Sequence, residues 1–260
     1  MNYETILLDI NSGIATLTLN RPDVFNAFNE QQSFDVIDAL KKIEKDKSVR
    51  VVIITGAGKA FCSGQDLKSI AAAKNRSLSD SLYKRYNPMI KAMRNLPLPI
   101  ICKLNGVAAG AGCSLALASD MIIASENASL IEVFINVGLV LDSGSSYFLP
   151  RLVGSARAFE LSTMGSKVSS TQALEWGMIN KVVKHEDLDT ETMKVAEYYA
   201  NAPTKAIALM KKMLNKSFYS DLDTMLEYEA YCQEIAGKTD DYKEGVASFN
   251  EKRKPLFKGN

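Results

Sequence analysis

The sequence predicts an α/β fold, with a layered core of strands and helices followed by a helical C-terminal region. Three observations lead to this prediction. Strand-like and helix-like segments alternate along the first part of the chain. One of them, VRVVIITG (49–56), is a continuous β-branched run, which is typical of a strand covered on both faces. Three amphipathic segments follow one another near the C-terminal end, so we expect the chain to be almost wholly helical after about residue 155.

The first elements are predicted to be a β-hairpin and a helix. Two short strand-like segments, ETILLDI (4–10) and IATLTLN (14–20), flank the turn signal Asn11-Ser12-Gly13. From Glu30 to Lys47, apolar residues recur at helical spacing with charged residues between them. The buried-type strand at 49–56 follows this helix.

The same order of elements, a helix followed by a strand, occurs a second time along the chain. A helix is expected around residues 79–95, because the chain then reaches Pro97 and Pro99. The strand PIICKLNG (99–106) and the small-residue stretch VAAGAGCSLALA (107–118) come next. The three amphipathic segments are APTKAIALMKKML, DLDTMLEYEAYCQEIA and DDYKEGVASFNEKR. We therefore predict a core over residues 1–195 and a helical region over residues 196–260.

Composition excludes several classes of protein. The net charge is +1, so there is no global basic field for a nucleic acid or an anionic membrane. No apolar stretch approaches the ~18 residues that a membrane-spanning helix needs. The N-terminal segment MNYETILLDINSG lacks the pattern of a signal peptide. The four cysteines form no CxxC pair, which favours buried, reduced thiols in a cytoplasmic protein.

Some catalytic motifs are also excluded. TGAGKA resembles a phosphate-binding loop, but Ile53 occupies the first glycine position and Ala60 the metal-binding hydroxyl position. GAGCSL resembles a dinucleotide-binding turn, but its third glycine is Leu115. The single histidine, His185, lies in a polar segment that is typical of a helix start, so a Ser-His-Asp relay is not expected. One histidine without a cysteine pair argues against a transition-metal site.

Two turns rich in small residues follow buried-type strands. They are FCSGQD (61–66) and GAGC (110–113), and the second also opens a helix. Backbone N–H groups at a helix start have no intrahelical partner. Two such turns on neighbouring strands could place two N–H donors about 3 Å from one oxygen, as an oxyanion hole does. Close packing of strand against helix explains the small residues equally well.

Several separated motifs make the chain resemble the crotonase superfamily, the enoyl-CoA hydratase/isomerase family. They are LNRPDVFNAF (19–28), AFCSGQDLK (60–68), NGVAAGAGCSLALASDMIIAS (105–125), GLVLDSGSSYFLPRLVG (138–154), ALEWGMINKVV (173–183) and FNEKRKPLF (249–257). The resemblance implies a spiral of ββα units, a C-terminal helical trimerisation region and an acyl-CoA substrate. It also implies a homotrimer or a hexamer built from two trimers.

The resemblance assigns roles to individual residues. Gln65 and Ala111 match the residues whose N–H groups bind the thioester carbonyl oxygen, so the backbone of Gln65 is expected to act rather than the side chains of Cys62, Ser63 or Asp66. CoA contacts are implied at Ala60, Phe61 and Lys68, and at Lys252, which would meet the CoA of a neighbouring subunit. The acyl pocket is expected at Phe134, Tyr147 and Phe148, for which packing in the core is the alternative. No metal or cofactor is implied beyond the CoA of the substrate.

Family hydratases use two glutamates to hold and deprotonate one water, and this chain departs from that pattern. Ser114 and Phe134 occupy the two positions, and neither side chain takes up a proton at neutral pH. Glu132 lies two residues from Phe134 and could act as the base only if the local loop were shifted. A hydratase that uses Glu132 is therefore the alternative within enzymes. A non-catalytic relative that binds RNA or serves in assembly is the alternative outside them.

Asp142 is the remaining carboxylate, at the position where family isomerases and dehalogenases carry their aspartate. It could also cap the next helix, because an aspartate before Ser-Gly-Ser-Ser is a normal helix start. A lone aspartate among apolar neighbours resembles most the 1,2-epoxyphenylacetyl-CoA isomerase subgroup of phenylacetate breakdown. The sequence thus predicts a CoA-thioester isomerase with one aspartate as proton shuttle.

Overall fold

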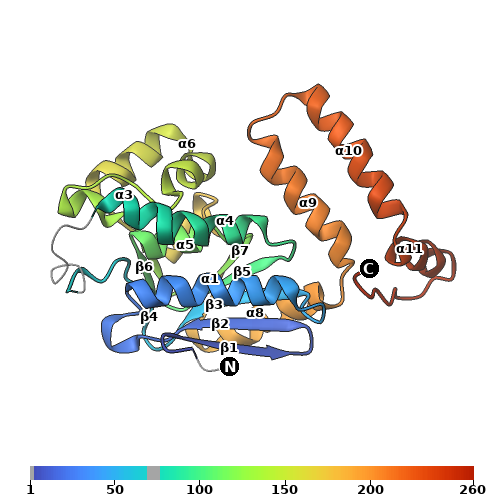
Figure 1. The fold of residues 1–260 in the computed structure, drawn as a ribbon, viewed down its shortest axis with the longest axis horizontal. Coiled ribbons are helices and arrows are strands. Elements are labelled where there is room, and N and C mark those ends of the chain that lie inside the picture. Colours follow the sequence, from blue (N-terminus) through green and yellow to red (C-terminus); the bar gives the residue numbers. More distant parts are fainter. Residues whose placement is uncertain (1–2, 69–76) are drawn as a thin grey trace.

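The computed structural model describes residues 3–68 and 77–260, and within these ranges two sheets form the core (Figure 1). The larger sheet contains, in order, β1 (Ile6–Asn11), β2 (Ile14–Leu19), β3 (Val51–Gly56), β5 (Ile100–Leu104), β7 (Met121–Ser125) and β10 (Lys181–Val183). The smaller sheet contains β4 (Ala60–Cys62), β6 (Val107–Ala109), β8 (Ser129–Ile131) and β9 (Lys167–Ser169). The predicted α/β fold is confirmed.

The predicted hairpin is present. β1 and β2 pair antiparallel, from Ile6 opposite Leu19 to Asn11 opposite Ile14. Ser12 and Gly13 between them both have positive φ, 50° and 80°, which suits the right-handed twist of a hairpin. β2 then pairs in parallel with β3, so the hairpin is joined to the rest of the sheet.

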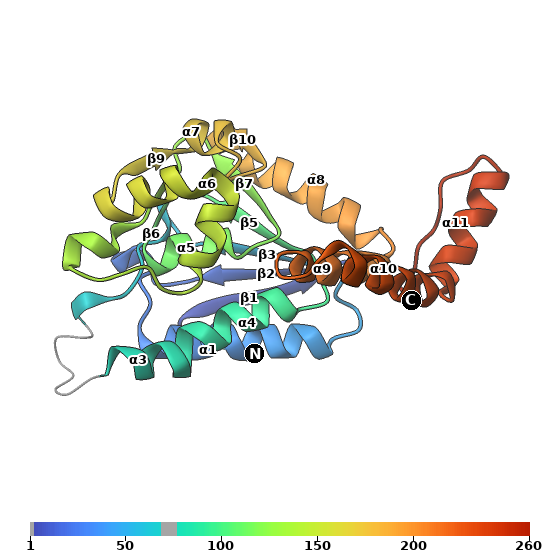
Figure 2. The ribbon, with the colours of Figure 1, turned by 90° about the horizontal axis from the view of Figure 1, so that it is seen from above.

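The larger sheet is covered on both faces, as the β-branched run predicts. Alternate residues of β3 enter two different apolar clusters, because successive side chains of a strand point to opposite faces. Val52 and Ile54 join the cluster that holds α1 (Glu30–Lys45) and α4 (Asn87–Asn95). Val51 and Ile53 pack with Leu188 and Ala196 of α8 (Leu188–Ala200). Figure 2 shows α1 and α4 on one side of the sheet and α8 on the other.

The helix expected at 79–95 is interrupted by a wider turn. It consists of α3 (Leu78–Ser81), the π-helical turn η2 (Leu82–Tyr86) and α4. A π-helical turn accommodates one extra residue and is frequent near functional sites.

The prediction of an almost wholly helical chain after residue 155 is partly wrong. Helices α6 (Ser145–Met164) and α7 (Ser170–Glu175) lie in that region, but β9 and β10 each extend one of the sheets. Both strands have only three residues, too few to show an alternating pattern. The remaining short elements are η1 (Pro22–Val24), α5 (Ala111–Leu117), η3 (Val133–Val137) and η4 (His185–Asp187).

Three helices form an arm that projects away from the sheets (Figure 1). They are α9 (Thr204–Ser217), α10 (Leu222–Gly237) and α11 (Asp240–Asn250). The buried Lys211 of α9 ties the arm to the core, because its Nζ donates to the carbonyls of Met93 and Leu98 at 3.0 Å each and pairs with Asp120 at 2.7 Å. Helix α8 spans the predicted boundary at residues 195–196, and the arm begins after it. Among the described helices, none combines the length and apolar character needed to cross a membrane.

Candidate active site

Three neighbouring strands of the smaller sheet end at the same place. β4, β6 and β8 run parallel, with Cys62 opposite Ala108 and Ala109 opposite Ile131. The segments that follow these strands therefore meet at one edge of the sheet, where ligands commonly bind in parallel sheets. Gln65 follows β4, Ala111 follows β6 and Phe134 follows β8.

The two small-residue turns are in direct contact. A Cβ built on Gly64 would lie 2.7 Å from the carbonyl oxygen of Ala109 and 3.5 Å from the nitrogen of Ala111. A Cβ on Gly112 would lie 2.2 Å from the carbonyl oxygen of Cys62. Glycine is thus required by packing at both positions. Ala111 is the first residue of α5, so its N–H has no acceptor within the helix.

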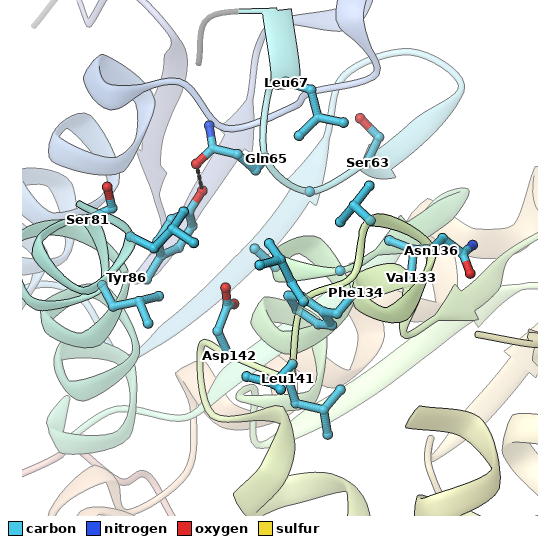
Figure 3. Close-up of a pocket in the computed structure, with 18 residues that line it drawn as sticks. Ser63, Gln65, Leu67, Ser81, Tyr86, Val133, Phe134, Asn136, Leu141 and Asp142 are labelled. Carbon is cyan, nitrogen blue, oxygen red and sulfur yellow. Dashed lines mark hydrogen bonds between the residues drawn. The ribbon is translucent and has the colours of Figure 1, made fainter. Parts of the chain in front are cut away.

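A cavity of about 300 Å³ opens beside these two turns (Figure 3). Gln65 and Ala111 both line it. Its walls are mainly apolar and come from Leu78, Leu82, Phe134, Leu139, Val140 and Leu141. This is the usual character of a pocket that takes an apolar small-molecule group and orients it with few polar contacts.

Among the described residues, Asp142 is the only acidic one that lines the cavity. In Figure 3 its carboxyl points into the space between Tyr86 and Phe134. Burial raises the pKa of this carboxyl above its ordinary value, and a hydrogen bond of 2.7 Å from the Ser143 hydroxyl to Oδ1 partly opposes that rise. A carboxylate with a raised pKa is a stronger base than an exposed one.

Asp142 does not cap the following helix, contrary to one of the two roles considered from the sequence. The N-cap position of α6 is Gly144, with φ 89° and no side-chain cap. The backbone carbonyl of Asp142, rather than its carboxyl, accepts the N–H of Ser145 at 3.0 Å. The helix starts later than the sequence suggests, and the Asp142 side chain is directed to the cavity instead.

Glu132 lies behind the cavity wall. It is 3% exposed and does not line the cavity. Its Oε1 accepts a hydrogen bond of 2.9 Å from the Ser145 hydroxyl, which lies 2.7 Å from the hydroxyl of Ser114. Burial is the largest cause that raises the pKa of Glu132, to about 7. The structure thus does not bring this glutamate to the position of a water-activating base.

Tyr147 and Phe148 lie outside the cavity lining, which corrects their expected place in the acyl pocket. The Tyr147 ring packs edge-on against Phe148 and Phe218, at 5.3 Å and 6.0 Å between ring centroids. The Arg94 guanidinium lies 5.7 Å from the Phe148 ring centroid. The two rings connect the first turn of α6 to neighbouring helices. Only Phe134 of the three expected residues lines the cavity.

The residues expected to contact CoA are spread over the molecule. Ala60 and Phe61 are 1% and 0% exposed, so both residues are buried in the isolated chain. Lys68 is exposed and directly follows Leu67, which lines the cavity. Lys252 follows α11, which lies at the end of the arm away from the sheets (Figure 2), and it does not line the cavity. The isolated chain therefore does not bring Lys252 to the site.

In the turn FCSGQD (61–66), the side chains of Cys62, Ser63 and Asp66 are either buried or bonded to other residues. Cys62 is fully buried, which raises the pKa of its thiol to about 12. Asp66 forms an ion pair with Arg21 at 2.9 Å, and Ser63, which lines the cavity, donates to the carbonyl of Val24. His185 does not line the cavity. Over residues 3–68 and 77–260, no group of three His, Cys, Asp or Glu side chains could hold a metal ion.

Sequence reasoning missed Tyr86, whose side chain lines the cavity and is 3% exposed. Its hydroxyl donates to Oε1 of Gln65 at 2.6 Å. In a regular amphipathic helix this position belongs to the apolar face, so the sequence carried no signal for a polar contact.

Comparison with known proteins agrees with this geometry. Residues 9–260 match the family described as enoyl-CoA hydratase/isomerase. The chain is 41% identical to the 1,2-epoxyphenylacetyl-CoA isomerase of Escherichia coli K12, over 98% of this chain and 99% of that protein. It is 38% identical to a protein of Rhodobacter capsulatus named "Probable enoyl-CoA hydratase", over the full length of both. The crystal structure of the enoyl-CoA hydratase of Bacillus anthracis superposes with a TM-score of 0.94, at 33% identity over 99% of this chain and 100% of that one.

Proposed function

The chain belongs to the enoyl-CoA hydratase/isomerase family, and from this premise we propose that it isomerises an acyl-CoA thioester with Asp142 as the single proton shuttle. The observation that carries the proposal is the carboxylate content of the cavity. Among the described lining residues Asp142 is the only acidic one, while Ser114 and Phe134 stand where family hydratases carry glutamates. A hydratase must activate a water, whereas an isomerase can remove and return a proton with one group.

The proposed mechanism begins at the thioester carbonyl. The N–H groups of Gln65 and Ala111 bind its oxygen and stabilise the negative charge that develops there. Asp142 takes a proton from a carbon of the acyl chain, and the electron pair of the broken C–H bond passes into the enolate. Asp142 then returns the proton to another carbon, which moves a double bond. With an epoxide fused to a diene ring, the C–C bond between the two epoxide carbons also breaks as the ring double bonds shift, and the product is a seven-membered enol ether. Because atoms move only within the substrate, this reaction calls for no redox cofactor.

The cavity suits such a base. Burial raises the pKa of Asp142, so its ionised form takes a proton from carbon more readily than an exposed aspartate would. The apolar walls exclude water and strengthen the two N–H contacts to the enolate oxygen.

We further propose 1,2-epoxyphenylacetyl-CoA or an unsaturated acyl-CoA as substrate. The E. coli relative named for that epoxide and the apolar character of the walls support this choice.

A panel of acyl-CoA thioesters tests the proposal. Purified protein is incubated in deuterated buffer with the epoxide, with unsaturated acyl-CoAs and with crotonyl-CoA, and products are followed by mass. We expect isomers of unchanged composition, apart from deuterium introduced at carbon, and slow hydration of crotonyl-CoA. Rapid addition of water to crotonyl-CoA without isomerisation of any other thioester would assign the chain to the hydratases instead.

A further inference from the structure

The side chain of Gln65 is held at both ends of its amide. Its Nε2 donates to the carbonyl of Phe28 at 2.7 Å. Its Oε1 accepts a hydrogen bond of 2.6 Å from the Tyr86 hydroxyl, drawn in Figure 3, and a second one of 3.3 Å from Nη2 of Arg85. Donors thus face the oxygen and an acceptor faces the nitrogen, which fixes the orientation of the amide.

The backbone on either side of Gln65 is also attached to Phe28. The N–H of Phe28 donates to the carbonyl of Gly64 at 2.7 Å, and the N–H of Asp66 donates to the carbonyl of Phe28 at 3.0 Å. The Tyr86 ring packs edge-on against the Phe28 ring, with 5.9 Å between centroids. Phe28, Gln65 and Tyr86 therefore contact one another pairwise, and the side chain of Gln65 links the other two.

The π-helical turn η2 supplies both donors to Oε1. Arg85 and Tyr86 are its last two residues, and both are buried, with 4% and 3% exposure. In an α-helix, successive side chains point about 100° apart and rarely converge on one atom. Here two successive residues of a π-helical turn donate to the same oxygen. Buried polar groups are costly unless they are paired, and the Tyr86 hydroxyl and Nη2 of Arg85 are each paired with Gln65.

We propose that Tyr86, assisted by Arg85, is a positioning residue that fixes the Gln65 side chain and thereby aims the Gln65 N–H at the thioester oxygen. The inference rests on the proposed function, because it assigns to Tyr86 an effect on the first donor of the proposed oxyanion hole. An oxyanion donor is effective only at about 2.7–3.1 Å from the oxygen, so a small rotation of this peptide weakens it. Tyr86 acts through Gln65 and has no proton-transfer role of its own.

The test is a double-mutant cycle of Tyr86→Phe and Gln65→Ala. Tyr86→Phe keeps the ring that packs on Phe28 and removes only the hydroxyl. We expect it to lower kcat by about tenfold, the effect of one lost hydrogen bond of ordinary strength, with KM changed less than twofold. In the Gln65→Ala background the same substitution should have no further effect, since its target is gone. Tyr83→Phe is the matched control, because Tyr83 lies on the same turn, is 73% exposed and does not line the cavity.

A spectroscopic probe separates this inference from the proposed function. An arylacryloyl-CoA, whose absorption moves to longer wavelength when its carbonyl is polarised, is bound to each variant. We expect a red shift with wild type and with Tyr83→Phe, and a clearly smaller one with Tyr86→Phe at saturation. A full red shift with Tyr86→Phe, or additive losses of kcat in the cycle, would overturn the role of Tyr86 alone. The absence of any red shift with wild type would contradict the proposed oxyanion hole itself, and this inference with it.

Discussion

The Ser143 hydroxyl donates a hydrogen bond of 2.7 Å to Oδ1 of Asp142, the neighbouring residue that lines the cavity. Two effects therefore act on the same carboxyl. Burial raises its pKa, and the hydrogen bond from Ser143 lowers it by stabilising the ionised form. Because the proposed reaction needs the ionised form, the hydrogen bond from Ser143 lowers the pH above which Asp142 can act.

Activity is expected to fall at low pH, as Asp142 becomes protonated below its raised pKa. Ser143→Ala removes the effect that lowers the pKa, so the acid limb of the kcat profile should move to higher pH. The profile is measured on wild type, Ser143→Ala and Ser146→Ala, whose side chain belongs to an exposed residue of the same segment. An acid limb that stays in place in Ser143→Ala would show that another group controls it.

Asp142→Asn should lower turnover by about 10² to 10⁴, the usual contribution of a positioned acid or base. The fold should survive, because asparagine is nearly isosteric and the backbone carbonyl that accepts the Ser145 N–H is unchanged. Burying a neutral amide costs less than burying a charge, so the melting temperature at neutral pH should not fall. The measurements are turnover, thermal melting and deuterium exchange into a bound acyl-CoA, which the variant should lose. Normal exchange in a folded variant would remove Asp142 from the mechanism.

The fold was predictable where a pattern extends over enough residues. The β-branched run at 49–56 predicts a strand buried on both faces, and its alternate residues do enter two clusters. β9 and β10 were missed because three residues carry no periodicity. Their pairing with distant strands stabilises them, and pairing is not visible in a single sequence.

The site was predictable in part. Position within the motifs indicated Gln65, Ala111, Phe134 and Asp142, and all four line one cavity. The capping alternative for Asp142 depended on the residue at which α6 begins, and helix ends are the least certain feature of a sequence pattern. The contact of Tyr86 with Gln65 joins the π-helical turn to a residue more than twenty positions earlier in the chain. No local sequence signal marks that turn.

Ala111→Pro deletes the second proposed donor and should lower turnover by roughly 10²-fold or more. Ala111 is the first residue of α5, a position at which proline is well tolerated because its N–H has no helical partner. The preceding Gly110 has φ 51°, so circular dichroism and thermal melting must accompany the kinetic measurement. A folded variant with normal turnover would exclude Ala111 from the oxyanion hole.

Removal of the chain from Asp240 onward should give monomers with weakened affinity for CoA. α11 and the residues after it form one unit, since the Asp241 carboxylate accepts the N–H groups of Lys258 at 2.6 Å and Gly259 at 2.8 Å. The resemblance to the family implies that this unit contacts a neighbouring subunit, where apolar side chains such as Phe249, 84% exposed, would become covered. Light scattering and calorimetry measure the two properties.

Lys252→Ala in the full chain separates assembly from binding. This variant should keep the oligomeric state of the wild type and lose CoA affinity by about fivefold, the order expected for one exposed ion pair. Trimers of unchanged affinity after the truncation would contradict both roles of the segment.

The substitution Glu132→Gln tests whether Glu132 is a buried group behind the cavity wall or a catalytic base. The most specific measurement on this variant is the pH dependence of its stability. Burial raises the pKa of Glu132 from 4.5 to about 7, so the folded protein binds its proton more tightly than the unfolded chain. The free energy of unfolding should therefore fall as pH rises from 4.5 to about 7, by at most about 3 kcal/mol. Glutamine stays neutral, so the variant should match wild type near pH 4, below the unfolded pKa, and melt at a higher temperature than wild type at pH 8. Its isomerase turnover should change less than threefold, because Glu132 does not line the cavity and Ser145 can still donate to the amide oxygen. If Glu132→Gln instead abolished turnover while Asp142→Asn left it intact, the base would be Glu132 and the chain would act as a hydratase.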